Sequence, residues 1–210
     1  MTDSLDPAKT LTAEWDELYT RLAAEIPGGE PNPVLVKEAS ELQPGRALDI
    51  GSGVGSDAIW LASQGWKVTA LDVSQVALDR AAARARQAGV EVEWVHGRLE
   101  DAQLAAGGFD LVNAHYPALR HSPTRDAEKA LLATVAPGGT LLVVHHADVD
   151  VEKAKSYGFD PADYLSHSDV AELFDERWHV QIHRRRLRER PTGVELQHTH
   201  DDVLKARRLR

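Results

Sequence analysis

The glycine-rich segment of residues 47–56 constrains the fold of this chain more than any other part of it. It reads ALDIGSGVGS, so a short apolar run meets three glycines with the spacing G-x-G-x-G. A helical pattern follows, which is the setting of the turn that joins a strand to a helix in a βαβ unit. Glycine supplies the backbone freedom that such a tight turn requires. The segment therefore predicts an α/β fold built on parallel strands.

Strand-like and helical stretches continue to alternate along the chain. Further strand-like runs lie at 68–71, 90–95, 109–112 and 140–144, and two longer ones at 178–188 and 194–209. The last two flank Pro191-Thr192-Gly193 and predict an antiparallel hairpin. Asn32 before Pro33, and Ser74 before an Ala/Arg-rich stretch that ends at Gly89, predict helix starts. We predict a Rossmann-like, doubly wound, mostly parallel seven-stranded sheet with helices on both faces and this hairpin at its end.

The third glycine of the loop comes one residue too early for a dinucleotide site. The dinucleotide fingerprint G-x-G-x-x-G would place it at Ser56, whereas the chain has Gly55. S-adenosylmethionine has no phosphate for a helix N-terminus, and its amino-acid tail and ribose must lie against bare backbone. Asp72 ends the second strand-like run and can accept hydrogen bonds from both ribose hydroxyls. Asp49, before the loop, suits the ammonium group. The pattern favours S-adenosylmethionine over NAD.

This D-x-G-x-G-x-G pattern, followed by a strand that ends in Asp, resembles class I S-adenosylmethionine-dependent methyltransferases. Residues 15–19 (WDELY), 29–33 (GEPNP) and 57–62 (DAIWLA) resemble the bacterial small-molecule subgroup related to tellurite-resistance and thiopurine methyltransferases. The resemblance implies a cofactor site made by Asp49, Gly51, Ser52, Gly53, Gly55, Asp72, Val73, Arg98, Leu99 and Asn113. It also implies an N-terminal lid over cofactor and substrate, carrying Trp15, Tyr19 and Asn32.

The chain departs from that family at three positions. Ser56 and Leu18 stand where many relatives have Arg, and Arg98 stands where relatives have an acid that meets the adenine amino group. Arg has only donors and cannot accept from an amine. The alternatives for this role are Glu100, Asp101 and the backbone of Leu99. We expect a single domain over residues 1–210, with a helical lid region at 1–45, a cofactor-binding core at 46–147 and a C-terminal part at 148–210.

Methyl transfer requires alignment more than any particular catalytic motif. A general base helps only where the acceptor carries a proton. The candidates are His115 and Tyr116, which follow the fourth strand-like run, and His146 at the end of the fifth, where His145 is its neighbour. Residues 113–116 (NAHY) differ from the Asn-Pro-Pro-Tyr motif of amino-methylating enzymes. An amine substrate is therefore not predicted.

Composition and charge limit the kinds of partner that this chain can bind. The net charge of −9 argues against nucleic acid, and the basic residues near the C-terminus are interpreted as solvated edge-strand charge. There is no cysteine, which excludes thiolate chemistry and Cys-ligated metals. His198 and His200 share a strand face with no identifiable third ligand, so no metal is predicted. No apolar run approaches the roughly 20 residues of a membrane span, and the acidic N-terminus lacks a signal pattern. We expect a cytoplasmic protein without a membrane partner.

The sequence thus predicts a methyltransferase that acts on a small-molecule substrate. Three alternatives stay open: a non-catalytic protein that binds S-adenosylmethionine or S-adenosylhomocysteine, an NAD-dependent oxidoreductase, and an RNA methyltransferase that uses the basic tail. The sequence does not distinguish among oxygen, nitrogen, sulfur and chalcogen oxyanions as the methyl acceptor. The oligomeric state is unknown.

Overall fold

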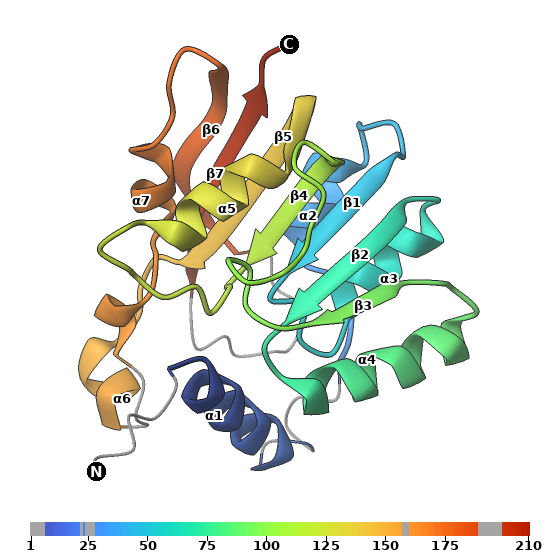
Figure 1. Cartoon of the computed structure of the whole chain (residues 1–210), viewed down its shortest axis with the longest axis vertical. Helices are drawn as coiled ribbons and strands as arrows, with labels where there is room; N and C mark the ends of the chain where they lie inside the picture. The colour runs from blue at the N-terminus through green and yellow to red at the C-terminus, as the bar shows by residue number, and fades with distance from the viewer. Residues whose placement is uncertain (1–6, 22, 24–27, 157–159, 189–198) are drawn as a thin grey trace. The chain divides into compact units, whose positions relative to one another are not determined.

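The computed structural model describes residues 7–21, 23, 28–156, 160–188 and 199–210 (Figure 1). Their contacts group into two compact units, Met1–Gln103 and Leu104–Arg210. Within the described ranges, no helix combines the length and the apolar character that crossing a membrane requires.

The first unit is a parallel sheet with helices packed on it. Its strands are β1 (Arg46–Ile50), β2 (Lys67–Asp72) and β3 (Glu93–His96), in the order β3-β2-β1. Both neighbouring pairs are parallel. Its helices are α1 (Pro7–Arg21), α2 (Pro33–Ala39), α3 (Ser56–Ser63) and α4 (Gln75–Ala88). Helix α3 packs on β1 and β2, and α4 packs on β2, β3 and α1 (Figure 1).

The second unit combines a parallel strand pair with an antiparallel end. Its strands are β4 (Phe109–His115), β5 (Val135–His146), β6 (Trp178–Leu187) and β7 (His200–Arg208), in the order β4-β5-β7-β6. β4 and β5 are parallel, whereas β7 is antiparallel to both β5 and β6. Its helices are α5 (Asp126–Thr134), α6 (Val151–Ser156), a 3-10 turn (Pro161–Asp163) and α7 (His167–Ala171). α5 packs on β4 and β5, and α7 on β5 and β7.

Local sequence signals explain the helix boundaries. The Asn32 side chain accepts a hydrogen bond from Val34 N at 2.9 Å, and Pro33 takes the first helical position of α2. The Ser74 hydroxyl likewise caps α4 by accepting from Ala77 N at 3.1 Å. Gly89 ends α4 in the left-handed conformation. These predicted helix starts and stops are confirmed.

The predicted fold class is confirmed, but the starts of β3 and β5 differ most from the predicted boundaries. β3 begins at Glu93 rather than Val90, because the Val90 N–H is used to close helix α4 by donating to Ala85 O at 3.1 Å. β5 begins at Val135 rather than Thr140, because a register shift against β4 lets the strand continue through its glycines. The predicted hairpin turn at 191–193 lies outside the described residues.

Candidate functional site

The glycine loop after β1 is held in a left-handed backbone conformation. Gly51, Gly53 and Gly55 have φ angles of 69°, 52° and 80°. Side chains are disfavoured at such angles, so all three positions favour glycine. The backbone N–H groups of Gly51 and Ser52 both donate to Leu71 O, at 2.9 and 3.1 Å. The loop is therefore fixed to the end of β2.

Asp72, the last residue of β2, is buried and joins this loop to the start of α4. Its Oδ2 accepts from Gly53 N at 2.8 Å, and its Oδ1 accepts from Ser74 N at 2.8 Å. Burial raises the pKa of Asp72, and the hydrogen bonds from Ser74 and Gly53 act in the opposite direction. A carboxylate has about four lone-pair sites. The carboxylate therefore keeps capacity to accept from the hydroxyl groups of a ligand such as a ribose.

Two further features of the loop fit S-adenosylmethionine. The Ser52 hydroxyl oxygen is buried and has no hydrogen-bond partner among the described residues. Leaving such a group unsatisfied costs about 1–3 kcal/mol, so a polar ligand group at this place is favourable. Asp49 is also buried, directly before the loop. The loop thus offers bare backbone, a hydroxyl and two acids to a ligand with an amino-acid tail and a ribose.

Helix α1 places an aromatic side chain against the loop. A Cβ atom added at Gly53 would lie 2.7 Å from the Tyr19 hydroxyl oxygen. Burial, followed by the negative charge of Asp72, raises the pKa of Tyr19, so its phenol stays protonated. The ring centroids of Trp15 and Tyr19 are 6.1 Å apart. Trp15 and Tyr19, two of the three predicted lid residues, are thus on the helix that contacts the glycine loop; that they cover a ligand stays a prediction.

Asp16 anchors α1 to the N-terminus of α4. Its Oδ1 accepts from the Ser74 hydroxyl at 2.6 Å and from Val76 N at 3.1 Å. A carboxylate at a helix N-terminus is favoured by the unpaired N–H groups and by the helix dipole. Because Ser74 also contacts Asp72, the position of α1 is coupled to the acid at the end of β2.

At Arg98 and Ser56, where the sequence differs from that of the relatives, the structure shows charged neighbours. The Arg98 guanidinium pairs with Glu100 and lies 3.8 Å from Asp101 Oδ2, so acidic neighbours balance its charge. Leu99 between them is buried. Arg84 of α4, which the sequence did not single out, donates to the Ser56 hydroxyl at 3.2 Å. Many relatives have an Arg at position 56 itself. Here a guanidinium also lies beside this position, but it belongs to Arg84 of α4.

The remaining predicted cofactor and lid residues have backbone or core roles. The Val73 carbonyl lies 3.0 Å from His96 Nε2. Besides capping α2, Asn32 donates its backbone N–H to Asp57 Oδ1 at 2.7 Å. Asn113 is fully buried on β4, in the second unit.

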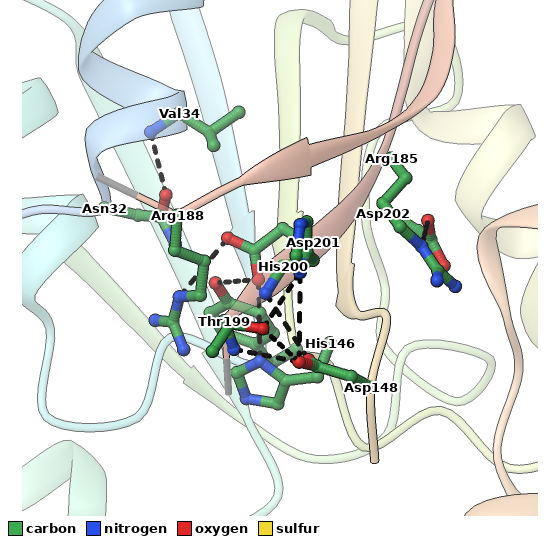
Figure 2. Close-up of polar contacts among 11 residues, drawn as sticks. Asn32, Val34, His146, Asp148, Arg185, Arg188, Thr199, His200, Asp201 and Asp202 are labelled. Carbon is green, nitrogen blue, oxygen red and sulfur yellow. Dashed lines mark hydrogen bonds and ion pairs between the residues drawn. The ribbon is translucent and has the colours of Figure 1, made fainter. Parts of the chain in front are cut away.

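In the second unit, two of the three catalytic candidates, Tyr116 and His146, lie against the buried carboxylate of Asp201. Figure 2 shows His146 and Arg188 beside Asp201. The Tyr116 hydroxyl donates to Asp201 Oδ1 at 3.0 Å, and His146 Nδ1 lies 3.5 Å from the same oxygen. The Tyr116 and His146 rings stack at 4.0 Å. Arg188 Nε lies 3.4 Å from Asp201 Oδ2, and its guanidinium carbon lies 5.4 Å from the Tyr116 ring centre. Tyr116, His146, Arg188 and Asp201 form what we call the Asp201 cluster.

The backbone of Tyr116 suggests that this arrangement is held against some strain. Tyr116 has a φ of 50°, which non-glycine residues rarely adopt, and its N–H donates to Val144 O at 2.8 Å. His115, the third candidate, is buried, and its ring centre lies 6.2 Å from that of Tyr116. The sequence analysis missed the roles of Asp201 and Arg188. The signal is the register of the antiparallel pair, which places Asp201 opposite His146.

His145, the neighbour of the predicted catalytic candidate His146, has unusual surroundings. Both of its ring nitrogens are buried, and neither has a hydrogen-bond partner among the described residues. Burial, with the neighbouring imidazoles of His167, His146 and His115, lowers the pKa of His145 to about 4, against a smaller opposite effect of Asp169. Its ring centre lies 6.4 Å from that of His167. The imidazole is therefore neutral near pH 7.

We expect His145 to make the protein sensitive to acid. Its pKa is about 4 in the folded state and about 6.5 when unfolded, so the unfolded state binds more protons between these values. The contribution to stability is complete above pH 6.5 and falls by about 3 kcal/mol as the pH drops to 4. Urea unfolding at pH 7 and pH 4.5 should show a smaller acid loss for His145→Leu than for the wild type. His179→Leu, at an exposed position on β6, should keep the wild-type loss, and equal losses in all three proteins would contradict the expectation.

The histidines and acids at the start of β7 do not show a metal site. The part of the chain that the structure describes contains no group of three His, Cys, Asp or Glu suited to a metal ion. His198 lies outside that part. His200 Nδ1 lies 2.9 Å from the Thr199 hydroxyl, which also donates to Asp148 Oδ2 at 2.5 Å (Figure 2). These bonds attach the start of β7 to the segment after β5.

Comparison with known proteins agrees with this geometry. Residues 47–139 match the model of a methyltransferase domain. An uncharacterized methyltransferase of Mycobacterium tuberculosis is 41% identical over 98 residues, which are 46% of this chain and 48% of that protein. The ribosomal protein L11 methyltransferase of Thermus thermophilus is 35% identical over 106 residues, 50% of this chain and 40% of that protein. The chain thus spans about half the length, or less, of these curated relatives.

A solved structure shows the same fold over nearly the whole chain. Magnesium protoporphyrin IX methyltransferase of Synechocystis, solved with bound S-adenosylhomocysteine, has a TM-score of 0.69 at 19% identity and covers 97% of this chain and 100% of its own. At that identity the likeness shows the fold, while the family match rests on the sequence of the core. Residues 47–139 are therefore similar in sequence to a methyltransferase domain, and the chain shares the fold of this solved methyltransferase.

Proposed function

We propose that this protein transfers the methyl group of S-adenosylmethionine to a small-molecule acceptor. The observation that carries the proposal is the geometry of Asp72, whose two oxygens accept the backbone N–H groups of Gly53 and Ser74 and keep capacity for hydroxyl donors. The same acid fixes Gly53, so loop and acid form one preorganised surface. When bound, S-adenosylmethionine supplies an electrophilic methyl group on a sulfonium sulfur.

Most of the predicted cofactor residues have a role in this proposal. Asp72 accepts from the ribose hydroxyls, and the Ser52 hydroxyl and Asp49 bind the amino-acid tail. Gly51 and Gly53 let the ligand approach the backbone. The buried Leu99 packs against the adenine ring, and Glu100 keeps the neighbouring Arg98 neutralised. Tyr19, protonated and beside Gly53, acts as a hydrogen-bond donor over the loop.

A small molecule is the acceptor that the charge pattern supports best. With a net charge of −9, the chain lacks the phosphate-neutralising excess that nucleic-acid binding requires. On β6, the exposed Arg185 has an acidic partner, since its Nε lies 3.3 Å from Asp202 Oδ1, and Arg188 is paired in the Asp201 cluster. The proposal also includes a cytoplasmic location, which the cysteine-free composition supports.

Transfer of a labelled methyl group tests the proposed activity. The full chain is incubated with S-adenosylmethionine labelled in the methyl group and with a panel of hydroxyl, amine and thiol compounds of different charge. We expect label in an acceptor, together with an equal amount of S-adenosylhomocysteine. Binding of S-adenosylhomocysteine without any labelled acceptor would favour a non-catalytic binding protein instead.

A further inference from the structure

The side chain of Arg84, on α4, lies where three segments of the first unit meet. One terminal nitrogen, Nη1, donates to the Val54 carbonyl and, at 3.2 Å, to the Ser56 hydroxyl. The other, Nη2, donates to the Gly29 carbonyl at 3.3 Å. Helix α4, the glycine loop and the segment before α2 therefore share one guanidinium. Arg84 and its three acceptor residues form what we call the Arg84 junction.

The two loop contacts of the Arg84 junction lie on either side of Gly55. Val54 precedes this glycine and Ser56 follows it, and Gly55 itself has a φ of 80°. A planar guanidinium holds its N–H donors in a fixed geometry, so two contacts to it restrict the backbone between them. The junction therefore restrains residues 54–56, while Asp72 restrains Gly53 just before them.

The segment before α2 is also bound to this place by its own backbone. Gly29 N donates to the Ser56 hydroxyl at 3.2 Å, and Asn32 N donates to Asp57 Oδ1 at 2.7 Å. Ser56 and Asp57 are the first two residues of α3. Because the Ser56 hydroxyl accepts from both Gly29 and Arg84, the guanidinium adds to the bonds that hold this segment on the start of α3.

The Arg84 junction joins a cation to uncharged oxygens. Its acceptors are the carbonyls of Val54 and Gly29 and the hydroxyl of Ser56. Burial, followed by the positive charge of Arg80, lowers the pKa of Arg84. A guanidinium keeps its charge at neutral pH, so a partly buried place beside Arg80 costs free energy. The bonds to the loop and to Gly29 offset this cost, and they fix backbone rather than pair charges.

We propose that Arg84 is a positioning residue, which holds the glycine loop in its binding conformation before S-adenosylmethionine arrives. This inference rests on the proposed function, because it assigns the ligand of the loop. A loop that is already ordered loses less conformational entropy when its ligand binds, so the affinity is higher. Arg84 acts through Val54, Gly55 and Ser56 and needs no contact with the ligand.

Calorimetric titration with S-adenosylhomocysteine measures the contribution of the Arg84 junction. Arg84→Met keeps the aliphatic stem, loses the guanidinium and should bind at least tenfold more weakly than the wild type. Arg84→Lys keeps the charge without the planar fork and should recover part of the loss. Arg86→Met, which removes an exposed arginine from the same helix, should bind like the wild type. Unchanged binding in a folded Arg84→Met protein, or an equal loss in Arg86→Met, would overturn the proposal.

A second variant moves the guanidinium without removing its charge. Gly28 has a φ of 77°, and a Cβ atom added there would overlap the Arg84 guanidinium. Since that group is the end of a flexible side chain, Gly28→Ala should displace it and weaken binding at least tenfold. In the Arg84→Met protein the same change should add less than threefold, because no guanidinium is left to displace.

The control for Gly28→Ala introduces the same kind of backbone strain elsewhere. Gly89 also has a positive φ, of 69°, so Gly89→Ala is strained without touching the junction and should bind like the wild type. Wild-type affinity in Gly28→Ala would contradict the requirement for a guanidinium at this place. Should Arg84→Met not fold, Gly28→Ala and Arg84→Lys decide the question.

Hydrogen exchange separates this proposal from the proposed function. Without ligand, amides of residues 51–58 should exchange faster in Arg84→Met than in the wild type, while β4 exchanges equally in both. Equal exchange of residues 51–58 would overturn the proposal. Faster exchange there, with a wild type that binds no S-adenosylhomocysteine, would support the ordering of the loop by Arg84 and contradict the proposed function. Wild-type binding that Arg84→Met retains in full would contradict the role of Arg84 and leave the proposed function standing.

Discussion

Replacing Asp72 by alanine is expected to weaken binding of S-adenosylhomocysteine about 100-fold or more. The ribose would lose two charge-assisted hydrogen bonds, each worth about 1.5–3 kcal/mol, and 100-fold corresponds to about 2.7 kcal/mol. The alanine also leaves the N–H groups of Gly53 and Ser74 without their acceptors, so the loop loses its attachment to α4. Isothermal titration of the purified variant measures the loss.

Two further variants make this result specific. Asp72→Asn keeps an acceptor oxygen but offers an amide N–H₂ to a backbone donor, so we expect an intermediate loss of about tenfold. Asp79→Ala removes an exposed acid of α4, which accepts from Gln75 Nε2 at 2.8 Å, and should bind like the wild type. An Asp72→Ala protein that binds within threefold of the wild type would show that the ribose is held elsewhere.

Replacing Gly55 by alanine is expected to lower the free energy of unfolding by about 4 kcal/mol. A Cβ atom at this position would lie 2.8 Å from the Trp94 ring and 2.9 Å from the Ala81 Cβ. Overpacking of this kind costs about 1–3 kcal/mol, and the left-handed conformation adds about 1–2 kcal/mol for a residue with a side chain. The early third glycine of the loop thus has a packing reason, because α4 and β3 approach it closely.

Gly89→Ala provides the matched control for Gly55→Ala. Gly89 also has a positive φ, of 69°, but among the described residues nothing beyond its chain neighbours and its own helix backbone lies within 4 Å of an added Cβ. Its cost should therefore be the conformational part alone, about 1–2 kcal/mol. Urea unfolding of both variants measures the difference, and equal costs would show that Trp94 and Ala81 yield without strain.

Local rules were enough to predict the parts of the fold that depend on neighbouring residues. The cap at Asn32 with Pro33, the cap at Ser74 and the stop at Gly89 each rest on a side chain or backbone angle within a few residues. The same holds for the glycine loop, whose meaning depends on strand, turn and helix in direct succession. The place of Asp72 beside the glycine loop could be predicted because the end of the second strand has a fixed position in a βαβ unit.

The features that the sequence analysis missed depend on residues far apart in the chain. Asp201 lies beside Tyr116 because of the register between β5 and β7. Tyr116 and Asp201 are 85 residues apart in the sequence, so no local pattern connects them. Arg84 reaches Ser56 from another helix, and nothing in its local sequence marks it. His145 and His146 look alike in sequence. Their different surroundings come from the strand alternation and from α7, which contacts β5.

The most direct test of the account is thermal unfolding of the full chain with S-adenosylhomocysteine and with NAD, each at about 100 times its expected dissociation constant. Such a ligand stabilises the folded state by about 2.7 kcal/mol, which raises the midpoint by roughly 5–10 °C in a domain of this size. We expect this rise with S-adenosylhomocysteine, its loss in Asp72→Ala, and no rise with NAD. A rise with NAD alone would contradict the reading of the glycine loop and Asp72 as a site for S-adenosylmethionine.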